Sequence, residues 1–569
     1  MIRKKINRSR INDIYIMIGV YLLAVMGYTL WVSNFTIPVH IKVDEELYIS
    51  MARSFHYEGV FSENGVRLNY SCILYSMLIS LAYYFCTPEN IIFGMRVIGV
   101  CTMLSSVFPI YLIAGKILKR KKYAVAISVL FCFIPSVIDV AYCMQEVLCY
   151  PVFLWMFYFI YREIEQEKTD KISKYAIIIT VLGILCYFIK TYMLFAIVAY
   201  EAFFILEGYR NRNREIWKKI LLLTILYISL YMGGKTLIDC INGGVAGENH
   251  YASQFSQLFP ITVKTIAAAC SCMVFYGVSW VFYMGVLPVI LPIYNLRKYE
   301  RSNQKIISFL ILCTAILTVE IVISIVLTEE GTVFFPHKFL YRYFQILEMP
   351  ILILFVQKIS RFKLPGWLWL AYSGIIGYLG GYFIYIGNKQ RTAIIDAPVF
   401  LLMENITKYI FPGFNILICV LAAGIVWAGY YTLRKNGEED VLKKFICIYI
   451  LGITAFFMIN MVQLPYYTNQ IADGNLLQKE SLEIVDYYME HKERYHKIYY
   501  IQNKSDRYES TIYAYFPSEI LKISEDDLQN RADADGLYIM SVNTDIEIDQ
   551  IAELQELKAY RVGTMRQKR

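Results

Sequence analysis

Long apolar runs, separated by short polar segments, recur along the chain from residue 14 to about residue 463. Most runs are close to the ~20 residues that a helix needs to cross the hydrocarbon core of a bilayer. The pattern therefore predicts a polytopic all-α membrane bundle. Its thirteen expected transmembrane helices span roughly residues 14–35, 91–115, 124–142, 147–161, 175–189, 191–207, 217–234, 270–295, 306–327, 343–357, 365–387, 411–433 and 445–463. The first run is too long for a cleaved signal peptide and lacks a small-residue cleavage site, so we expect a retained helix.

Basic residues concentrate in alternate connections between the runs. The connections that we place in the cytoplasm hold 30 Lys and Arg residues, and they are 1–13, 116–123, 162–174, 208–219, 296–305, 358–363 and 434–444. Because cytoplasmic loops are enriched in Lys and Arg, this asymmetry predicts an N-terminus inside and a C-terminus outside. A further apolar stretch, 69–86, would invert this distribution if it crossed the membrane. We therefore expect it to lie in, or re-enter, the outer interface.

The outer segment between the first two spans, residues 36–90, begins with an acidic stretch. Asp44, Glu45 and Glu46 precede apolar residues spaced as on one face of a helix, which are Leu47, Tyr48, Met51, Ala52 and Phe55. This spacing predicts an amphipathic helix on the outer membrane surface, ended by Gly59. In the simplest interpretation the three acids only stabilise a helix N-terminus.

Residues 464–569 differ from the rest of the chain, with 19 Asp and Glu residues, 13 Lys and Arg residues and no long apolar run. Strand-like "KIYYIQN", "GLYIMSV" and "AYRVGTM" alternate with helix-like stretches, one of them near 547–557. We expect a small extracytoplasmic α/β domain with a parallel sheet. The chain is thus divided into a membrane domain, 1–463, and a C-terminal domain, 464–569.

Composition narrows the class of protein. Hydrophobic residues make up 57% of the chain and charged residues only 18%, which excludes an ordinary soluble protein. The net charge of +8 does not indicate nucleic-acid binding, because the cations lie in the short loops between spans. No cysteine follows Cys447, so the C-terminal domain has no disulfide framework.

The acidic motif and several later residues resemble the GT-C glycosyltransferases of membranes. The similarity is greatest to the family 39 group, which includes protein O-mannosyltransferases and the aminoarabinose transferases of lipid A. It is carried by "DEELYISMARSFHYEGV", by single residues farther along the chain and by "HKFLYRYFQILEMP". The matching positions are Asp44, Glu45, Tyr48, Ala52, Arg53, Gly59, Arg96, Glu146, Lys190, Arg342 and Tyr343.

The resemblance implies a fold and a chemistry. Such enzymes transfer a sugar from a polyprenyl phosphate, and the lipid keeps the reactive phosphate at the membrane interface. The expected reaction is an inverting hexosyl or pentosyl transfer on the outer face. The resemblance assigns catalysis to Asp44, as the general base, and to Glu45 and Glu146. The residues expected to bind the donor phosphate are Arg96, Lys190, Arg342 and Tyr343. Those expected to contact the donor or the acceptor are Tyr48, Tyr70 and Lys338.

The sequence leaves several alternatives open. Arg96 would also suit a helix end, and Lys190 a tight turn. A divalent cation, Mg²⁺ or Mn²⁺, is possible at Asp44, Glu45 and Glu146, although the spacing requires no metal. Glu201 and Glu320 lie within spans, where carboxylates are functional candidates or are buried by pairing. They would suit a transporter or lipid flippase, the competing function. A non-catalytic scaffold for the C-terminal domain is a third reading.

The expected partners are a polyprenyl-phosphate sugar donor, the lipid bilayer and an acceptor in the cell envelope. The acceptor is a lipid, a wall polymer or a protein, and nucleic acid is not expected. An Ile- and Lys-rich composition favours a bacterial plasma membrane, in which the active site would face outside.

Overall fold

The computed structural model describes most of the chain outside residues 380–473. The described residues are 2–35, 44–63, 66–166, 173–242, 262–284, 286–328, 340–358, 474–502, 509–518, 520–524, 535–544 and 546–565, with scattered residues between 367 and 379 and residues 461 and 528. The predicted spans 365–387, 411–433 and 445–463 lie largely outside these residues. The predicted boundary between 463 and 464 lies outside them as well, and the division into two domains stays a prediction.

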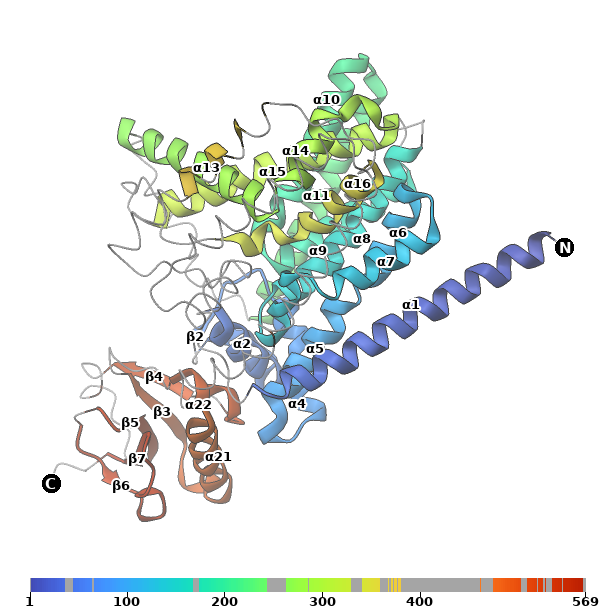
Figure 1. Ribbon diagram of the computed structural model, residues 1–569. Helices are drawn as coiled ribbons and strands as arrows, with labels where there is room; N and C mark the ends of the chain where they lie inside the picture. Colours follow the sequence, from blue (N-terminus) through green and yellow to red (C-terminus); the bar gives the residue numbers. More distant parts are fainter. Residues whose placement is uncertain are drawn as a thin grey trace.

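Helices make up the membrane part of the molecule (Figure 1). They are α1 (Ile2–Val32), α2 (Asp44–Glu58), α3 (Leu74–Ile79), α4 (Ala82–Phe85), α5 (Ile91–Leu104), α6 (Val107–Leu118), α7 (Lys121–Phe131), α8 (Glu146–Glu165), α9 (Lys174–Ile189), α10 (Leu194–Asn211), α11 (Arg214–Ile241), α13 (Val263–Tyr283), α14 (Leu287–Tyr294), α15 (Arg301–Thr328) and α16 (Glu348–Lys358). A short hairpin of β1 (Ser62–Glu63) and β2 (Val66–Arg67) follows α2.

Seven helical segments of the described chain are long and apolar enough to cross a membrane, or eight if the bent pair of α7 and η2 (Pro135–Ala141) is one span. The prediction of a helical, multi-span membrane protein is therefore confirmed, whereas the number of thirteen and the orientation stay predictions. The predicted spans 175–189 and 343–357 correspond to α9, of 16 residues, and α16, of 11 residues, and both are shorter than the candidate spans. The predicted span 270–295 is divided into α13 and α14, because Pro288 begins a new helix.

Local sequence explains several helix ends near the functional regions. Lys119 and Arg212 have left-handed backbone conformations, with φ of 55° and 49°, and end α6 and α10. The side chain of Asn213 accepts a hydrogen bond from the backbone N–H of Glu215 and so caps α11. Pro135 cannot continue α7, and the chain bends by 47° before it enters η2. This bend leads the chain to Glu146, where α8 begins.

Residues 69–86 form two short helices and no candidate span. Leu74–Phe85 is an apolar segment, but 12 residues reach only about 18 Å as a helix. That length falls short of the bilayer core, and the segment packs against α5. The amphipathic helix predicted after the first span is α2, which begins at Asp44 as expected.

The described C-terminal residues form a five-stranded sheet with helices beside it. Its elements are α21 (Gly474–Glu490), β3 (Lys497–Gln502), α22 (Glu509–Tyr515), β4 (Ile520–Ser524), β5 (Gly536–Ser541), β6 (Asp549–Gln550), η9 (Ala552–Leu554) and β7 (Tyr560–Thr564). The strand order is β4-β3-β5-β7-β6. Strands β4, β3 and β5 are parallel as predicted, whereas β7 runs antiparallel to β5.

Two details of this sheet correct the sequence prediction. Strand β4 was not expected, and the helix predicted near 547–557 is wrong. Residues Asp549 and Gln550 instead pair with β7 at the sheet edge, and only the 3-10 turn η9 follows. The apolar spacing of this stretch suits a helix, but the open edge of β7 offers backbone hydrogen bonds that a lone helix would not satisfy.

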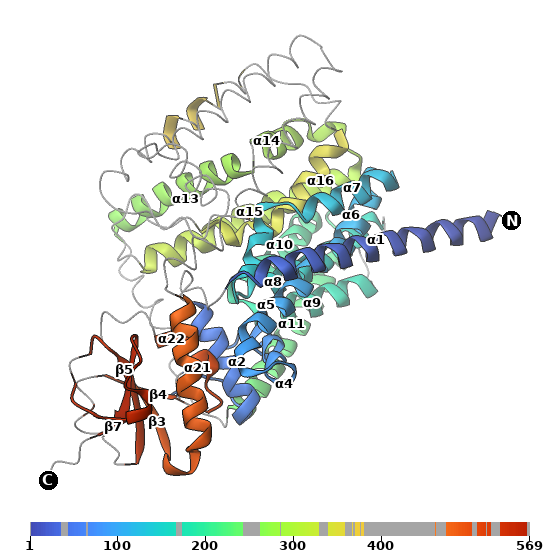
Figure 2. The ribbon, with the colours of Figure 1, turned by 60° about the horizontal axis from the view of Figure 1, so that its bottom comes forward.

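Helix α22 of the C-terminal region packs against α2 and α5 at one end of the bundle (Figure 2). The Arg53 guanidinium donates to the carbonyl of Ser518 at 3.0 Å, and the Tyr83 hydroxyl donates to that of Ala514 at 3.2 Å. Arg53 is almost completely buried at this junction. The surface helix α2 is therefore fixed from both sides, by the bundle and by the C-terminal residues.

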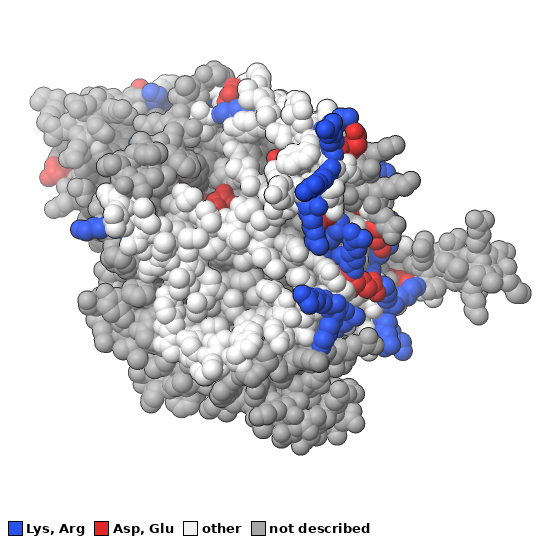
Figure 3. Space-filling model, turned by 90° about the horizontal axis from the view of Figure 1, so that it is seen from above, with Lys and Arg blue, Asp and Glu red and all other residues white. Residues whose placement is uncertain are grey.

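The basic loops gather at the opposite end of the bundle. Ion pairs join Lys116 to Glu165 at 2.9 Å and Lys119 to Glu300 at 2.6 Å, which links the ends of α6, α8 and α15. Figure 3 looks onto this end and shows a band of Lys and Arg side chains. Because α8 runs from Glu146 to Glu165, the two ends are separated by the length of a membrane-spanning helix.

Candidate active site

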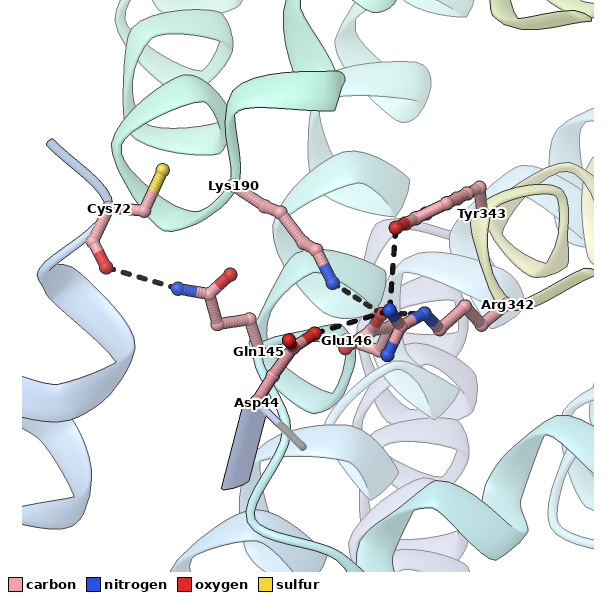
Figure 4. A network of polar contacts seen from close by, with 7 residues as sticks. All are labelled: Asp44, Cys72, Gln145, Glu146, Lys190, Arg342 and Tyr343. Carbon is pink, nitrogen blue, oxygen red and sulfur yellow. Dashed lines mark hydrogen bonds and ion pairs between the residues drawn. The ribbon is translucent and has the colours of Figure 1, made fainter. Parts of the chain in front are cut away.

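Four separate segments bring charged side chains together at the α2 end of the bundle (Figure 4). Asp44 is the first residue of α2 and Glu146 the first residue of α8. Lys190 lies between α9 and η3 (Thr191–Met193), and Arg342 lies in η5 (Tyr341–Tyr343). These segments are far apart in the sequence, so the cluster exists only because the bundle packs their ends together.

Glu146 is the centre of the cluster. Lys190 Nζ donates to its Oε1 at 2.6 Å, and Arg342 Nε lies 3.4 Å from the same oxygen. The side chains of Glu146, Lys190 and Arg342 are only 4%, 9% and 10% exposed. Two buried cations thus share one carboxylate oxygen, and the remaining charge must be balanced by a second anion.

Asp44 supplies this second anion. Arg342 donates through Nη2 to Asp44 Oδ2 at 3.2 Å, so one guanidinium contacts both carboxylates. The Asp44 side chain is 40% exposed, far more than the other three. It is therefore the member of the cluster that a bound molecule can reach.

Aromatic rings lie beside both cations. Lys190 Nζ lies 5.2 Å from the ring centre of Tyr343 and 5.6 Å from that of Tyr192. Burial lowers the pKa of Lys190, but the Glu146 carboxylate acts in the opposite direction, and the pKa lies above its usual value. Lys190 is thus a stable cation. Tyr192 was not predicted, although its position two residues after Lys190 in the same turn could have indicated it.

Two predicted tyrosines lie beside the cluster on the α2 side. Tyr48 is buried one turn after Asp44, with its ring 5.8 Å from that of Tyr75. Burial, and then the neighbouring Tyr70, Asp44 and Glu146, raise the pKa of Tyr48, so its phenol stays protonated. Tyr70 is half-buried and also close to Cys72. A hydrogen bond of 3.0 Å from the Gln145 side chain to the carbonyl of Cys72 fixes the segment around Tyr70 to the start of α8.

Glu45 and Arg96 have contacts of a different kind. Glu45 is buried and accepts a 2.7 Å hydrogen bond from the backbone N–H of Cys143, just before α8. Arg96 is also buried and donates to the carbonyls of Ala141 and Phe35 at 3.0 and 2.7 Å. Both side chains therefore hold the chain around the cluster in place. A catalytic role for Glu45 and a phosphate-binding role for Arg96 stay predictions.

The other predicted groups are located as follows. Lys338 lies outside the described residues. No three His, Cys, Asp or Glu side chains of the described chain form a group that could hold a metal ion. Glu45 and Glu146 are also poor partners for a shared cation with Asp44, because one binds a backbone N–H and the other binds Lys190 and Arg342.

Comparison with known proteins places the fold. Residues 75–319 match a family described as a domain of unknown function, DUF6311. No curated protein sequence matches the chain. Among solved structures, ArnT from Cupriavidus metallidurans bound to undecaprenyl phosphate is similar with a TM-score of 0.53 and 9% identity, over 96% of this chain and 97% of that one.

A second structure of ArnT from the same organism, in the apo state, is similar with a TM-score of 0.50 and 11% identity. It covers 97% of this chain and 98% of its own. At such identities the likeness shows the fold alone. The predicted resemblance to the GT-C aminoarabinose transferases is thus confirmed at the level of the fold.

Proposed function

We propose that this chain, which has the fold of ArnT, is a membrane glycosyltransferase that uses a sugar carried on a polyprenyl phosphate. The acceptor would be a lipid, wall polymer or protein of the cell envelope. The observation that carries the proposal is the cluster of Asp44, Glu146, Lys190 and Arg342, which combines two buried cations with one accessible carboxylate. The solved ArnT structure bound to undecaprenyl phosphate supports a lipid donor of this kind.

Asp44 is the best candidate for the general base. Its carboxylate is the exposed one, and the contact with Arg342 restricts its orientation. A carboxylate in this position removes the proton of the acceptor as the acceptor attacks the anomeric carbon, which inverts the configuration there. General-base catalysis of this type contributes about 10²–10⁴-fold to a rate.

Lys190 and Arg342 are suited to the leaving group. As the glycosidic bond breaks, negative charge grows on the lipid phosphate, and preorganised cations stabilise it. When Asp44 takes up a proton, the cluster loses one negative charge and keeps both cations. The electrostatics of the cluster thus become more favourable for the phosphate at the moment when its charge increases.

The location at the membrane boundary fits a lipid donor. The isoprenoid tail remains in the bilayer, since each buried CH₂ is worth about 0.8 kcal/mol. Asp44 begins a helix that follows the first membrane helix, at the end of the bundle opposite the basic loops. With the basic end in the cytoplasm, the reaction would take place on the outer face. None of these steps requires a metal ion, and a divalent cation stays a prediction.

A transporter or lipid flippase is the competing function. It depends on Glu201 and Glu320, two carboxylates that lie within predicted spans. Glu201 accepts a hydrogen bond of 2.9 Å from Thr224, which joins α10 to α11 and gives it a packing role. Glu320 is partly buried on α15, and no ion pair joins it to another of the described residues. Movement of a lipid or solute in proteoliposomes, without a glycosidic product, would favour the transporter.

The experiment is a substitution at Asp44 with a neighbouring control. Asp44→Asn keeps the size of the side chain and removes the base, so envelope glycans made by the protein should disappear while membrane insertion is unchanged. Glu46→Gln in the same helical turn should retain them. The measurement is mass spectrometry of envelope glycans from cells with each variant. Wild-type glycans with Asp44→Asn would exclude the base role.

A further inference from the structure

A cavity of about 450 Å³ lies at the turn between α10 and α11, at the basic end of the bundle. It is remote from the candidate active site, because α10 begins next to Lys190 and ends at this turn. Its lining is made of arginines and aromatic residues together with one glycine: Gly208, Tyr209, Arg210, Arg212, Arg214 and Trp217.

The three arginines of the cavity have no carboxylate partner among the described residues. The nearby acids are engaged elsewhere: Glu207 pairs with Lys305 at 2.5 Å, and Glu215 pairs with Lys218 at 2.7 Å. Three guanidinium groups around one cavity therefore produce a local excess of positive charge. Guanidinium groups bind phosphate through paired hydrogen bonds, so this lining suits a phosphate group.

The backbone explains how the cavity is formed. Arg212 has a left-handed conformation, with φ of 49°, which turns the chain sharply between the two helices. At Gly208 a Cβ would lie 3.2 Å from Ile216 Cγ2 and 3.5 Å from Trp217 Nε1, so glycine allows the close approach of α10 and α11. Arginines at every second position of this turn line one concave surface.

An apolar stripe begins at the cavity and follows α11. It consists of exposed residues three or four positions apart, which lie on one face of the helix: Trp217, Leu221, Ile225, Ile228 and Met232. Tyr209 is exposed beside it. Trp and Tyr at the boundary, followed by aliphatic residues, are typical of a helix face in contact with lipid.

We infer that this cavity binds the phosphate headgroup of an anionic phospholipid, whose acyl chain lies along the stripe on α11. The charge of the cavity complements the headgroup, and the stripe that continues from Trp217 complements the chain. Basic loops by themselves only orient a membrane protein, whereas here the cations line a concave site that opens onto an apolar surface. The inference does not depend on the proposed reaction at the other end of the bundle.

The test measures lipid binding to the full chain in detergent micelles by native mass spectrometry, with cardiolipin and phosphatidylcholine as probes. The triple variant Arg210→Gln, Arg212→Gln and Arg214→Gln removes the charge of the cavity. A matched control, Lys119→Gln, Lys121→Gln and Lys122→Gln, removes the same charge from another turn at the basic end. Thermal unfolding verifies that both proteins fold.

Cardiolipin should bind the wild-type chain and the control with similar affinity. It should bind the arginine variant about 100-fold more weakly, because each of the three cations strengthens binding about 5-fold. Equal losses in both triple variants would mean general attraction to a basic surface and would overturn the inference. Release of cardiolipin by millimolar inorganic phosphate would point instead to a site for free phosphate and would also overturn it. Equal binding of phosphatidylcholine would remove the headgroup assignment.

Discussion

Helix α8 carries a buried carboxylate near each end, and the two have different surroundings. Glu146, its first residue, shares one oxygen with Lys190 and Arg342. Glu163, 17 residues later and about 25 Å away along the helix, pairs with Lys219 and accepts a 2.6 Å hydrogen bond from Tyr200. The Glu163 and Lys219 side chains are both 1% exposed.

The two clusters differ in the number of charged groups and in their exposure to solvent. Within the described part of the chain, Glu163 pairs with one cation, Lys219, whose ammonium also lies 4.0 Å from the ring centre of Phe204. This pair is closed and joins α8 to α11. Among the residues that the structure describes, two cations meet two carboxylates at Glu146, and one of these carboxylates, Asp44, is exposed. A buried ion pair by itself therefore indicates helix packing, whereas a cluster with one exposed charged side chain indicates a candidate site.

The largest expected effect concerns the closed pair. Lys219→Met leaves Glu163 buried without its cation, which should destabilise the protein by about 3–5 kcal/mol. Activity per folded molecule should not change, because the pair is remote from Asp44. Thermal unfolding in detergent measures the first quantity and sugar transfer by the purified protein the second.

The double variant Lys219→Met with Glu163→Gln is the control for this experiment. It removes both charges, so most of the lost stability should return. If the single variant is as stable as the wild type, the pair does not hold α8 and α11 together. If the single variant is folded but inactive, the two clusters are coupled and the comparison fails.

Lys190→Met tests the open cluster. It removes one of the two cations expected to face the leaving phosphate, and transfer should slow by about 10²–10³-fold. The loss of stability should be smaller than for Lys219→Met, because Arg342 still contacts Glu146. The turnover rate and the unfolding midpoint, measured on one preparation, compare the two lysines. A purely structural Lys190 would reverse this order.

Arg342→Lys is a milder change at the same site. Lysine keeps the charge but cannot contact Asp44 and Glu146 through separate nitrogens, as Arg342 does through Nη2 and Nε. We expect transfer to fall by about 10-fold, roughly the value of one charged hydrogen bond. Full activity of Arg342→Lys would show that the charge alone is sufficient.

The pH dependence should reveal the smallest effect. Because the pKa of Lys190 is raised in the folded protein, its contribution to stability is fully present below the unfolded pKa of about 10.4. This contribution is lost only as the pH rises through the higher folded pKa. Rates for the wild type and Lys190→Arg should therefore follow parallel profiles between about pH 6 and about pH 9. A decline near pH 8 in the wild type alone would indicate that Lys190 loses its proton early.

Much of the local structure could be predicted from the sequence. Apolar runs mark the membrane helices, and the acidic start of α2 and the strands β3, β5 and β7 follow from patterns within short segments. The interpretation failed where distant partners compete for a segment. Residues 549–550 joined the edge of β7, and residues 520–524 became a strand beside β3.

In the candidate site, too, the sequence predicted which residues matter but not which of them come into contact. The resemblance to the GT-C family selected Asp44, Glu146, Lys190 and Arg342, which the fold brings into contact. The same resemblance selected Glu45 and Arg96, whose side chains bond to backbone groups of neighbouring segments. Charge type is a local property, but the direction in which a helix presents a side chain depends on the packing around it.

The sequence by itself determined that the chain is a bundle of membrane helices with basic residues at one end and acids at a helix start, because hydrophobicity and charge act residue by residue. Only the tertiary structure decided which cation meets which carboxylate. It left Asp44 accessible, enclosed Glu163, and formed the arginine cavity between α10 and α11. Those outcomes depend on contacts between helix ends that lie far apart along the chain, and packing of the whole bundle sets them.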